Sequence, residues 1–164
     1  MAALHVRAWR ATYAGLIPDE FLAGLKVEDR EARWRGSLTA PEVAPGERTI
    51  LVAEDAGGVI GFASAGHARS DDELGMGEVY AINVDPPAWR RGAGRALLAA
   101  ATSWLDGRFA ASILWVVDRN QRARALYEGA GWSVDGAAKI ETYAGADVNN
   151  VRYRRAASRT RAPA

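Results

Sequence analysis

The feature that most constrains the fold is an apolar run followed by a basic glycine turn. Residues 79–84 read Val-Tyr-Ala-Ile-Asn-Val, typical of a strand, and residues 90–98 read Arg-Arg-Gly-Ala-Gly-Arg-Ala-Leu-Leu, which opens a helix. Two glycines let the backbone bend so that consecutive N–H groups converge, and the helix adds its own unpaired N–H groups. Such a turn favours phosphate, and the flanking arginines strengthen that preference. The segment therefore predicts a strand–turn–helix unit that holds a phosphorylated cofactor.

The composition limits the class of protein. With 164 residues, the chain is long enough for one buried core and short for two domains. The formal net charge of +1 gives no general attraction to nucleic acid or to a membrane. The absence of cysteine excludes disulfides, thiolate nucleophiles and cysteine metal sites, and no apolar stretch approaches the roughly 20 residues that span a bilayer. We expect a cytoplasmic protein with no signal peptide at its start and no bound metal.

Hydrophobic spacing divides the chain into an α/β pattern. Helices are expected at 4–13, 19–25, 27–38, 91–105 and 120–130, and strands at 49–53, 59–65, 78–84, 112–117, 132–143 and 148–153. The nearly all-apolar run 112–117 is typical of a strand buried on both faces. Residues 41–46 and 68–77 are expected to be loops. One domain is expected over 1–155, followed by a disordered tail over 156–164.

A glycine turn before a helix can belong to one of three kinds of phosphate site. The alternative is a turn that binds no ligand. A P-loop requires Gly-Lys-Ser/Thr, and neither lysine of this chain is near the turn. A dinucleotide site would use Gly92 and Gly94, with Asp118 as a ribose ligand. However, Leu97 replaces the third glycine and only one βαβ unit is present, so an NAD-dependent oxidoreductase is the less favoured alternative. The third option is coenzyme A, whose diphosphate suits the same turn.

Two motifs favour the third option. Residues 89–94 read Trp-Arg-Arg-Gly-Ala-Gly, and residues 120–132 read Asn-Gln-Arg-Ala-Arg-Ala-Leu-Tyr-Glu-Gly-Ala-Gly-Trp. They resemble the motifs Q/R-x-x-G-x-G/A and N-x-x-A-x-x-L-Y-x-x-x-G-F of the GNAT superfamily of acyl-CoA-dependent N-acyltransferases. Trp89 stands where Gln or Arg is usual, and Trp132 replaces Phe. The segment from His5 to Asp19 is also similar to one bacterial branch, so the resemblance covers nearly the whole chain.

The resemblance implies a mixed, mostly antiparallel central sheet flanked by helices, with one departure. In the family a strand precedes the first helix, whereas this sequence begins inside that helix. The first family strand is therefore expected to be missing, or to lie upstream of Met1. If it is missing, the strand 49–53 becomes an edge of the sheet with unpaired backbone groups. We expect a partner chain, as in a homodimer, or the tail to cover that edge.

The resemblance also implies roles for individual residues. Tyr127 would be the general acid that protonates the departing thiolate, although a core aromatic is the alternative. Glu78 would be the general base, as in some members, with a solvated strand-end carboxylate as the equal alternative. The expected cofactor-binding residues are Ile82, Asn83, Val84, Arg90, Arg91, Gly92, Ala93, Gly94, Arg95, Ala96, Asn120 and Tyr127. The expected acceptor-binding residues are Trp9, Tyr13, Glu20 and Tyr143.

The expected function is transfer of an acetyl group from acetyl-CoA to a primary amine of a small molecule, peptide or protein. No cysteine is present and neither histidine sits in a nucleophile-and-base arrangement, so we expect the amine to attack directly in a ternary complex. A non-catalytic acyl-CoA sensor that keeps the same cleft is the alternative. The arginines at 152–161 favour a solvated tail over a nucleic-acid site, because only Tyr153 accompanies them as an aromatic platform.

Overall fold

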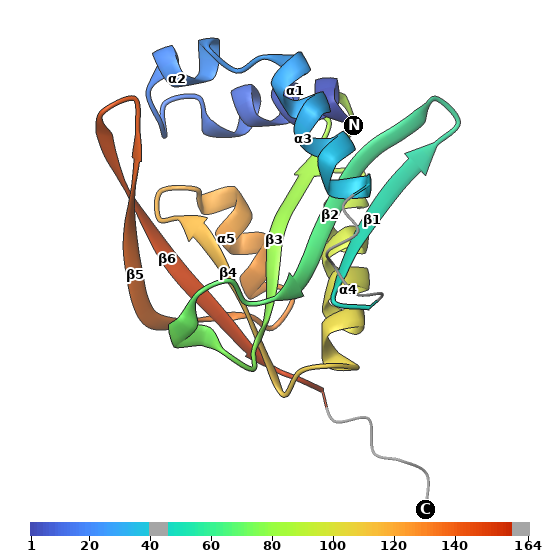
Figure 1. Cartoon of the computed structure of the whole chain (residues 1–164), viewed down its shortest axis with the longest axis vertical. Helices are drawn as coiled ribbons and strands as arrows, with labels where there is room; N and C mark the ends of the chain where they lie inside the picture. The colour runs from blue at the N-terminus through green and yellow to red at the C-terminus, as the bar shows by residue number, and fades with distance from the viewer. Residues whose placement is uncertain (40–45, 159–164) are drawn as a thin grey trace, which may run out of the picture.

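The strands of the computed structural model, which describes residues 1–39 and 46–158, form one sheet in the order β1-β2-β3-β4-β6-β5 (Figure 1). Their bounds are Arg48–Asp55 (β1), Gly58–His67 (β2), Gly77–Val84 (β3), Ala111–Val117 (β4), Ser133–Tyr143 (β5) and Ala146–Ala156 (β6). Strands β3 and β4 are parallel, and every other neighbouring pair is antiparallel. This arrangement confirms the mixed, mostly antiparallel sheet that the sequence predicts.

The helices fall where hydrophobic spacing predicts them, with small differences at their ends. Their bounds are Ala2–Tyr13 (α1), Asp19–Ala23 (α2), Val27–Thr39 (α3), Ala93–Asp106 (α4) and Gln121–Glu128 (α5), with 3₁₀ turns at Asp71–Glu73 (η1) and Pro86–Ala88 (η2). Helix α5 is shorter than expected because it ends at Gly129 rather than at Gly131. Of the loop expected at 41–46, only Gly46 is described, and residues 159–164 of the expected tail also lie outside the described residues.

Neighbouring residues of β2 show how the two helical layers cover the sheet. Successive strand side chains point to opposite faces, so Phe62 and Ala63 face different layers. Phe62 packs with Leu4 of α1 and Trp34 of α3. Ala63 packs instead with Leu98 of α4, in the larger core cluster that α5 also joins. The sheet therefore lies between α1 and α3 on one face and α4 and α5 on the other (Figure 1).

The parallel pair β3–β4 is joined over only part of its length. The paired residues are Gly77 with Ser112, Glu78 with Ile113, and Val79 with Leu114, although both strands continue further. At the same level the register between β3 and β2 shifts by one residue, because Ala65 pairs with Val79 while Ser64 pairs with Ala81. Tyr80 is thus an extra residue in β3, and such a bulge bends and twists a strand. The bulge accounts for β3 turning away from β4 at this point.

Strand β1 has β2 as its neighbour and lies at one edge of the sheet, which confirms the prediction for residues 49–53. What covers this edge stays a prediction. Strand β6 continues to Ala156, slightly beyond the predicted end of the domain. Among the described residues, no helix has the length and apolar character needed to cross a membrane.

Candidate active site

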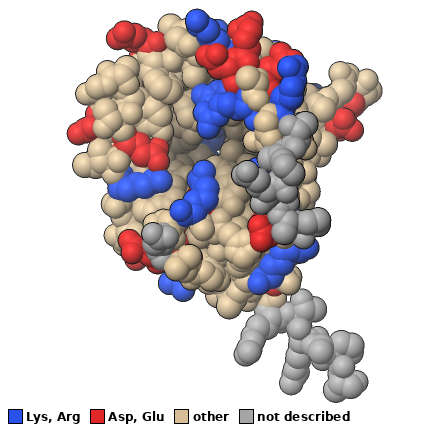
Figure 2. All heavy atoms as spheres, in the orientation of Figure 1, with Lys and Arg blue, Asp and Glu red and all other residues tan. Residues whose placement is uncertain are grey.

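A cavity of about 500 Å³ opens where β3 and β4 separate. Its walls come from the unpaired ends of both strands, the last turn of α1, the start of α4 and one side of α5. The volume lies within the range of small-molecule and cofactor sites. Figure 2 shows a hollow below α1 and α2 on the face turned to the viewer, with Lys and Arg side chains beside it.

Most of the predicted site residues line this cavity. From the cofactor set these are Ile82, Asn83, Val84, Arg90, Gly92, Gly94, Arg95, Asn120 and Tyr127, and from the acceptor set they are Trp9 and Tyr13. The cavity lining does not include Arg91, Ala93, Ala96, Glu78, Glu20 or Tyr143. Residues that line it but were not predicted include Thr12, Trp89, Trp115, Arg122 and Leu126.

The glycine turn has the backbone shape that an anion site requires. Arg90 and Gly92 both have positive φ, 61° and 90°, and Gly92 is the N-cap of α4. No side chain caps this helix end, so its first N–H groups remain available. Arg91 turns away from the cavity toward the β1–β2 hairpin, where its guanidinium lies 3.5 Å from Asp55. An uncapped helix start beside Arg90 therefore fits a diphosphate group.

Tyr127 keeps its proton in this site. Burial, and then the neighbouring Tyr13 and Tyr153, raise the pKa of its phenol far above the usual value. Among the hydrogen bonds of residues 1–39 and 46–158, none involves its hydroxyl, although the ring lines the cavity and lies 5.8 Å from that of Tyr153. A neutral phenol with a free O–H is suited to donate a proton.

Asn120 has a structural role as well as a place in the cavity. Its Oδ1 accepts a hydrogen bond from the backbone N–H of Ala123 at 3.2 Å, which caps the start of α5. This contact accounts for an Asn at the residue before the helix. The same side chain is buried and lines the cavity, so its amide nitrogen is the part placed to meet a ligand.

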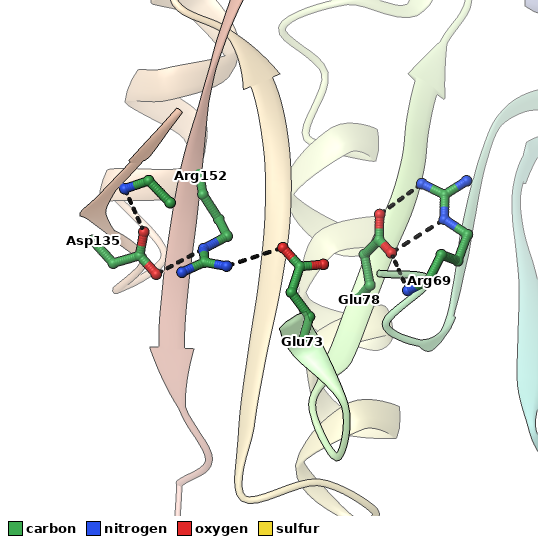
Figure 3. Close-up of polar contacts among 6 residues, drawn as sticks. Arg69, Glu73, Glu78, Asp135 and Arg152 are labelled. Atoms are coloured by element: carbon green, nitrogen blue, oxygen red, sulfur yellow. Dashed lines mark hydrogen bonds and ion pairs between the residues drawn. The ribbon is translucent and has the colours of Figure 1, made fainter. Parts of the chain in front are cut away.

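Glu78 is buried and already engaged by Arg69. The Arg69 guanidinium donates to both carboxylate oxygens, at 3.1 and 2.6 Å, and the Arg69 backbone N–H donates at 3.1 Å (Figure 3). The solvated carboxylate considered from the sequence is therefore wrong, because Glu78 is only 3% exposed. The other strand residue that was considered for the base role, Tyr80, donates its hydroxyl to the His67 carbonyl at 2.6 Å.

The segment 68–77 is more ordered than a plain loop. Glu73 of η1 is buried, and it accepts a hydrogen bond from Arg152 of β6 at 3.0 Å. Arg152 also donates to Asp135 of β5 at 2.8 Å (Figure 3). These contacts, together with the Arg69–Glu78 pair, fix the segment against the sheet beside the cavity.

Only some of the residues that were predicted to bind the acceptor lie close together. The Trp9 and Tyr13 rings lie 4.8 Å apart on α1, and Tyr143 packs 5.0 Å from Phe21 of α2 and 6.5 Å from Trp9. Burial and then the charge of Glu141 raise the pKa of Tyr13 to about 12. Glu20 lies exposed on α2 and is not part of this aromatic group.

In the sequence, Trp89 stands out only as a departure from a motif, and Arg122 is not among the predicted site residues. The Trp89 indole N–H donates to the Val84 carbonyl at 2.7 Å, and the Arg122 guanidinium lies 3.5 Å from the ring centroid. The Trp at position 89, where the motif usually has Gln or Arg, was the sequence feature that could have indicated this contact. Nothing in the helical spacing of residues 120–130 indicates that Arg122 reaches it.

The comparisons with known proteins agree with this geometry. The model of the acetyltransferase (GNAT) family matches residues 9–132. An uncharacterized N-acetyltransferase, YuaI of Bacillus subtilis (strain 168), is 38% identical over 122 residues, which are 73% of this chain and 66% of that protein. A mycothiol acetyltransferase of Amycolatopsis mediterranei (strain U-32) is 34% identical over 126 residues, or 68% of this chain and 42% of that protein. The chain thus spans less than two thirds of the length of these relatives.

Two solved structures show the same fold. A ribosomal-protein-alanine N-acetyltransferase from Brucella melitensis has a TM-score of 0.70 at 21% identity, covering 94% of this chain and 91% of that one. The yncA protein of Salmonella typhimurium, solved with its cofactor acetyl-CoA, has a TM-score of 0.68 at 20% identity, covering 99% and 91%. At these identities the likeness concerns the fold. With the family model matching from α1 through the end of α5, the chain belongs to the GNAT acetyltransferase family.

Proposed function

We propose that this chain transfers an acetyl group from acetyl-CoA to a primary amine. The observation that carries the proposal is one cavity that joins an uncapped, arginine-flanked helix start to the half-buried phenol of Tyr127. A phosphate-binding end and a proton-donating end in the same cavity suit a long phosphorylated thioester. The family match and the relatives with N-acetyltransferase names support the same reaction.

The residues that would hold acetyl-CoA fit its two chemical parts. The N–H groups at the start of α4, together with Arg90 and Arg95, would hold the diphosphate. On the side of β3 that faces β4, no described strand pairs with the backbone beyond Val79, so Ile82 and the N–H of Val84, whose carbonyl already accepts from Trp89, would pair with amides of an extended arm. When bound, the cosubstrate supplies the acetyl group as a reactive thioester.

Tyr127 would act as the general acid. Its phenol is neutral, so its O–H is present to hydrogen-bond to the sulfur and to protonate the thiolate as it departs. The amine would attack directly, since the chain has no cysteine to form an acyl-enzyme. The unpaired N–H groups of β3 would stabilise the oxyanion.

For Glu78, the geometry favours an anchoring role over the base role. Its two oxygens accept three hydrogen bonds from Arg69, and it does not line the cavity. We therefore propose that the amine loses its proton to solvent and that Glu78 holds Arg69 in place. Glu78→Gln tests this: loss of the acidic limb of the pH profile of kcat/KM would return the base role to Glu78.

The experiment that tests the function is an assay of free CoA thiol across a panel of amines. The panel comprises small diamines, aminoglycosides, amino acids and peptides with free N-termini or lysines. We expect amine-dependent thiol release by the wild-type protein and little release by Tyr127→Phe. A protein that binds acetyl-CoA but releases no thiol with any amine would instead be a sensor.

A further inference from the structure

We infer that Arg122, stacked on Trp89, supplies a cation that grips the cofactor diphosphate from the α5 side of the cavity. The inference rests on the proposed function, because it concerns how the same site holds its cosubstrate. The ligand chemistry is a diphosphate, and Arg122 lies on α5, outside the glycine motif to which Trp89 belongs.

Trp89 is fixed as a platform by its own hydrogen bond. Its indole N–H donates to the Val84 carbonyl at 2.7 Å, so the ring is held against the end of β3. The Arg122 guanidinium carbon lies 3.5 Å from the centroid of that ring. At this distance the flat guanidinium stacks on the indole, which attracts it electrostatically and leaves its edge free for hydrogen bonds.

A third element fixes the same guanidinium. Arg122 Nη2 donates to Thr12 Oγ1 of α1 at 3.1 Å. Arg122 thus links α5 to α1 and to the segment before α4, and all three residues line the cavity. Because the side chain is already held, binding an anion costs it little conformational freedom.

Arg122 lies near a second cation, Arg90, and its own charge is not neutralised by an ion pair among the described residues. Within the described ranges, 1–39 and 46–158, no carboxylate forms an ion pair with Arg122 or with Arg90, which lines the same cavity. Burial and then the charge of Arg90 lower the pKa of Arg122. Two like charges at one end of a cavity repel each other, and a diphosphate between them would relieve that repulsion.

Two other stacked cations beside the cavity differ in this respect. Arg69 lies over Tyr80 and pairs with Glu78, and Lys139 lies over Trp115 and pairs with Glu141. Those cations are neutralised within the protein. Arg122 on Trp89 is stacked in the same way but keeps its charge for a ligand.

This arrangement explains the Trp in the glycine motif. The indole N–H of Trp89 is used by Val84, so Trp89 offers no donor to a phosphate. A Gln or Arg at that position would offer one. In this chain Arg122 would supply the donor to the phosphate in place of residue 89, and the Trp89 ring would hold the Arg122 guanidinium in position.

The test is calorimetric titration of the wild-type protein and of Arg122→Ala with CoA, 3′-dephospho-CoA and pantetheine. We expect Arg122→Ala to weaken CoA and 3′-dephospho-CoA alike by roughly tenfold or more and to leave pantetheine unchanged, because one charge-assisted hydrogen-bond donor to phosphate is lost. Arg108→Ala is the matched control, since Arg108 stacks on Trp104 at 4.1 Å and neither residue lines the cavity. It should bind all three ligands as the wild type does.

A double variant tests the relocation itself. Trp89→Arg combined with Arg122→Ala returns a guanidinium to the motif position and should restore 3′-dephospho-CoA affinity to within about threefold of the wild type. Equal affinity of wild type and Arg122→Ala for CoA would overturn the inference, as would a loss for CoA but not for 3′-dephospho-CoA, or a double variant that restores nothing. Failure of the wild type to bind CoA would instead overturn the proposed function.

Discussion

Val79 and Leu114 are the last residue pair that β3 and β4 share. Beyond this pair, Tyr80 and Trp115 belong to separate walls of the cavity, and the backbone of β3 is open on the side where β4 would continue. One register shift in β3 thus creates both the space and the unpaired backbone groups that a long cosubstrate needs.

Tyr127→Phe separates binding from chemistry. The variant keeps the ring that lines the cavity and removes the only proton that the side chain can donate. We expect kcat to fall by about a hundredfold, as for loss of a general acid, with acetyl-CoA affinity within twofold of the wild type. Steady-state kinetics with calorimetry checks this. An unchanged kcat would assign Tyr127 to packing alone.

Glu78→Gln tests the buried ion pair. The variant leaves Arg69 without a charged partner, so we expect the free energy of unfolding to fall by about 1–3 kcal/mol in urea titrations. The control is Glu31→Gln, which removes the exposed pair with Arg35 that lies at 3.1 Å and should change stability by less than about 0.5 kcal/mol. Equal small effects in both variants would contradict the anchoring role of Glu78.

The two glycines of the turn should respond differently to alanine. Gly92 has φ of +90°, so Gly92→Ala should cost about 1–2 kcal/mol of folding stability through backbone strain alone. At Gly94, a Cβ would lie 3.7 Å from Val84 and 3.8 Å from Leu126, in ordinary contact at the cavity wall. Gly94→Ala should therefore keep its melting temperature but weaken acetyl-CoA binding.

Gly94→Asp extends this comparison, because it adds negative charge beside a diphosphate and should weaken acetyl-CoA binding further. Calorimetry and thermal melts separate the two effects in all three variants. Unchanged acetyl-CoA affinity in a folded Gly94→Asp protein would contradict a phosphate site at this turn.

His5 predicts a pH dependence of stability. Burial, and then Arg30 and Arg33, lower the pKa of the folded His5 to about 4 from the usual 6.5. Between those values the unfolded chain takes up a proton that the folded chain does not, so stability should fall as pH drops from about 6.5 to 4. Urea unfolding at several pH values should show a smaller fall in His5→Phe than in the wild type. A fall of equal size in wild type and His5→Phe would refute the assignment.

The sequence predicted the local elements of the site better than their relation in space. The glycine turn and the α5 motif depend on spacing along the chain, and Gly92, Gly94, Asn120 and Tyr127, which the sequence assigns to one site, line the same cavity. The bulge at Tyr80 depends on how β3 pairs with β2, and apolar alternation along one strand does not encode that register.

Charged residues were the hardest to place. In the sequence, Glu78 could be interpreted as a solvated carboxylate at the end of a strand. In the structure Arg69, nine positions earlier, forms hydrogen bonds with it. The sequence indicates no partner for Arg122, and the folded chain brings α1 and Trp89 beside it. Both contacts are tertiary, and the sequence holds no periodic signal for either.

The most direct measurement is a crystal structure of the protein with acetyl-CoA. We expect diphosphate oxygens to accept hydrogen bonds from backbone N–H groups within residues 91–96, with the thioester between β3 and β4 and near the Tyr127 hydroxyl. A complex in which that turn is empty and the cosubstrate lies elsewhere would contradict this expectation.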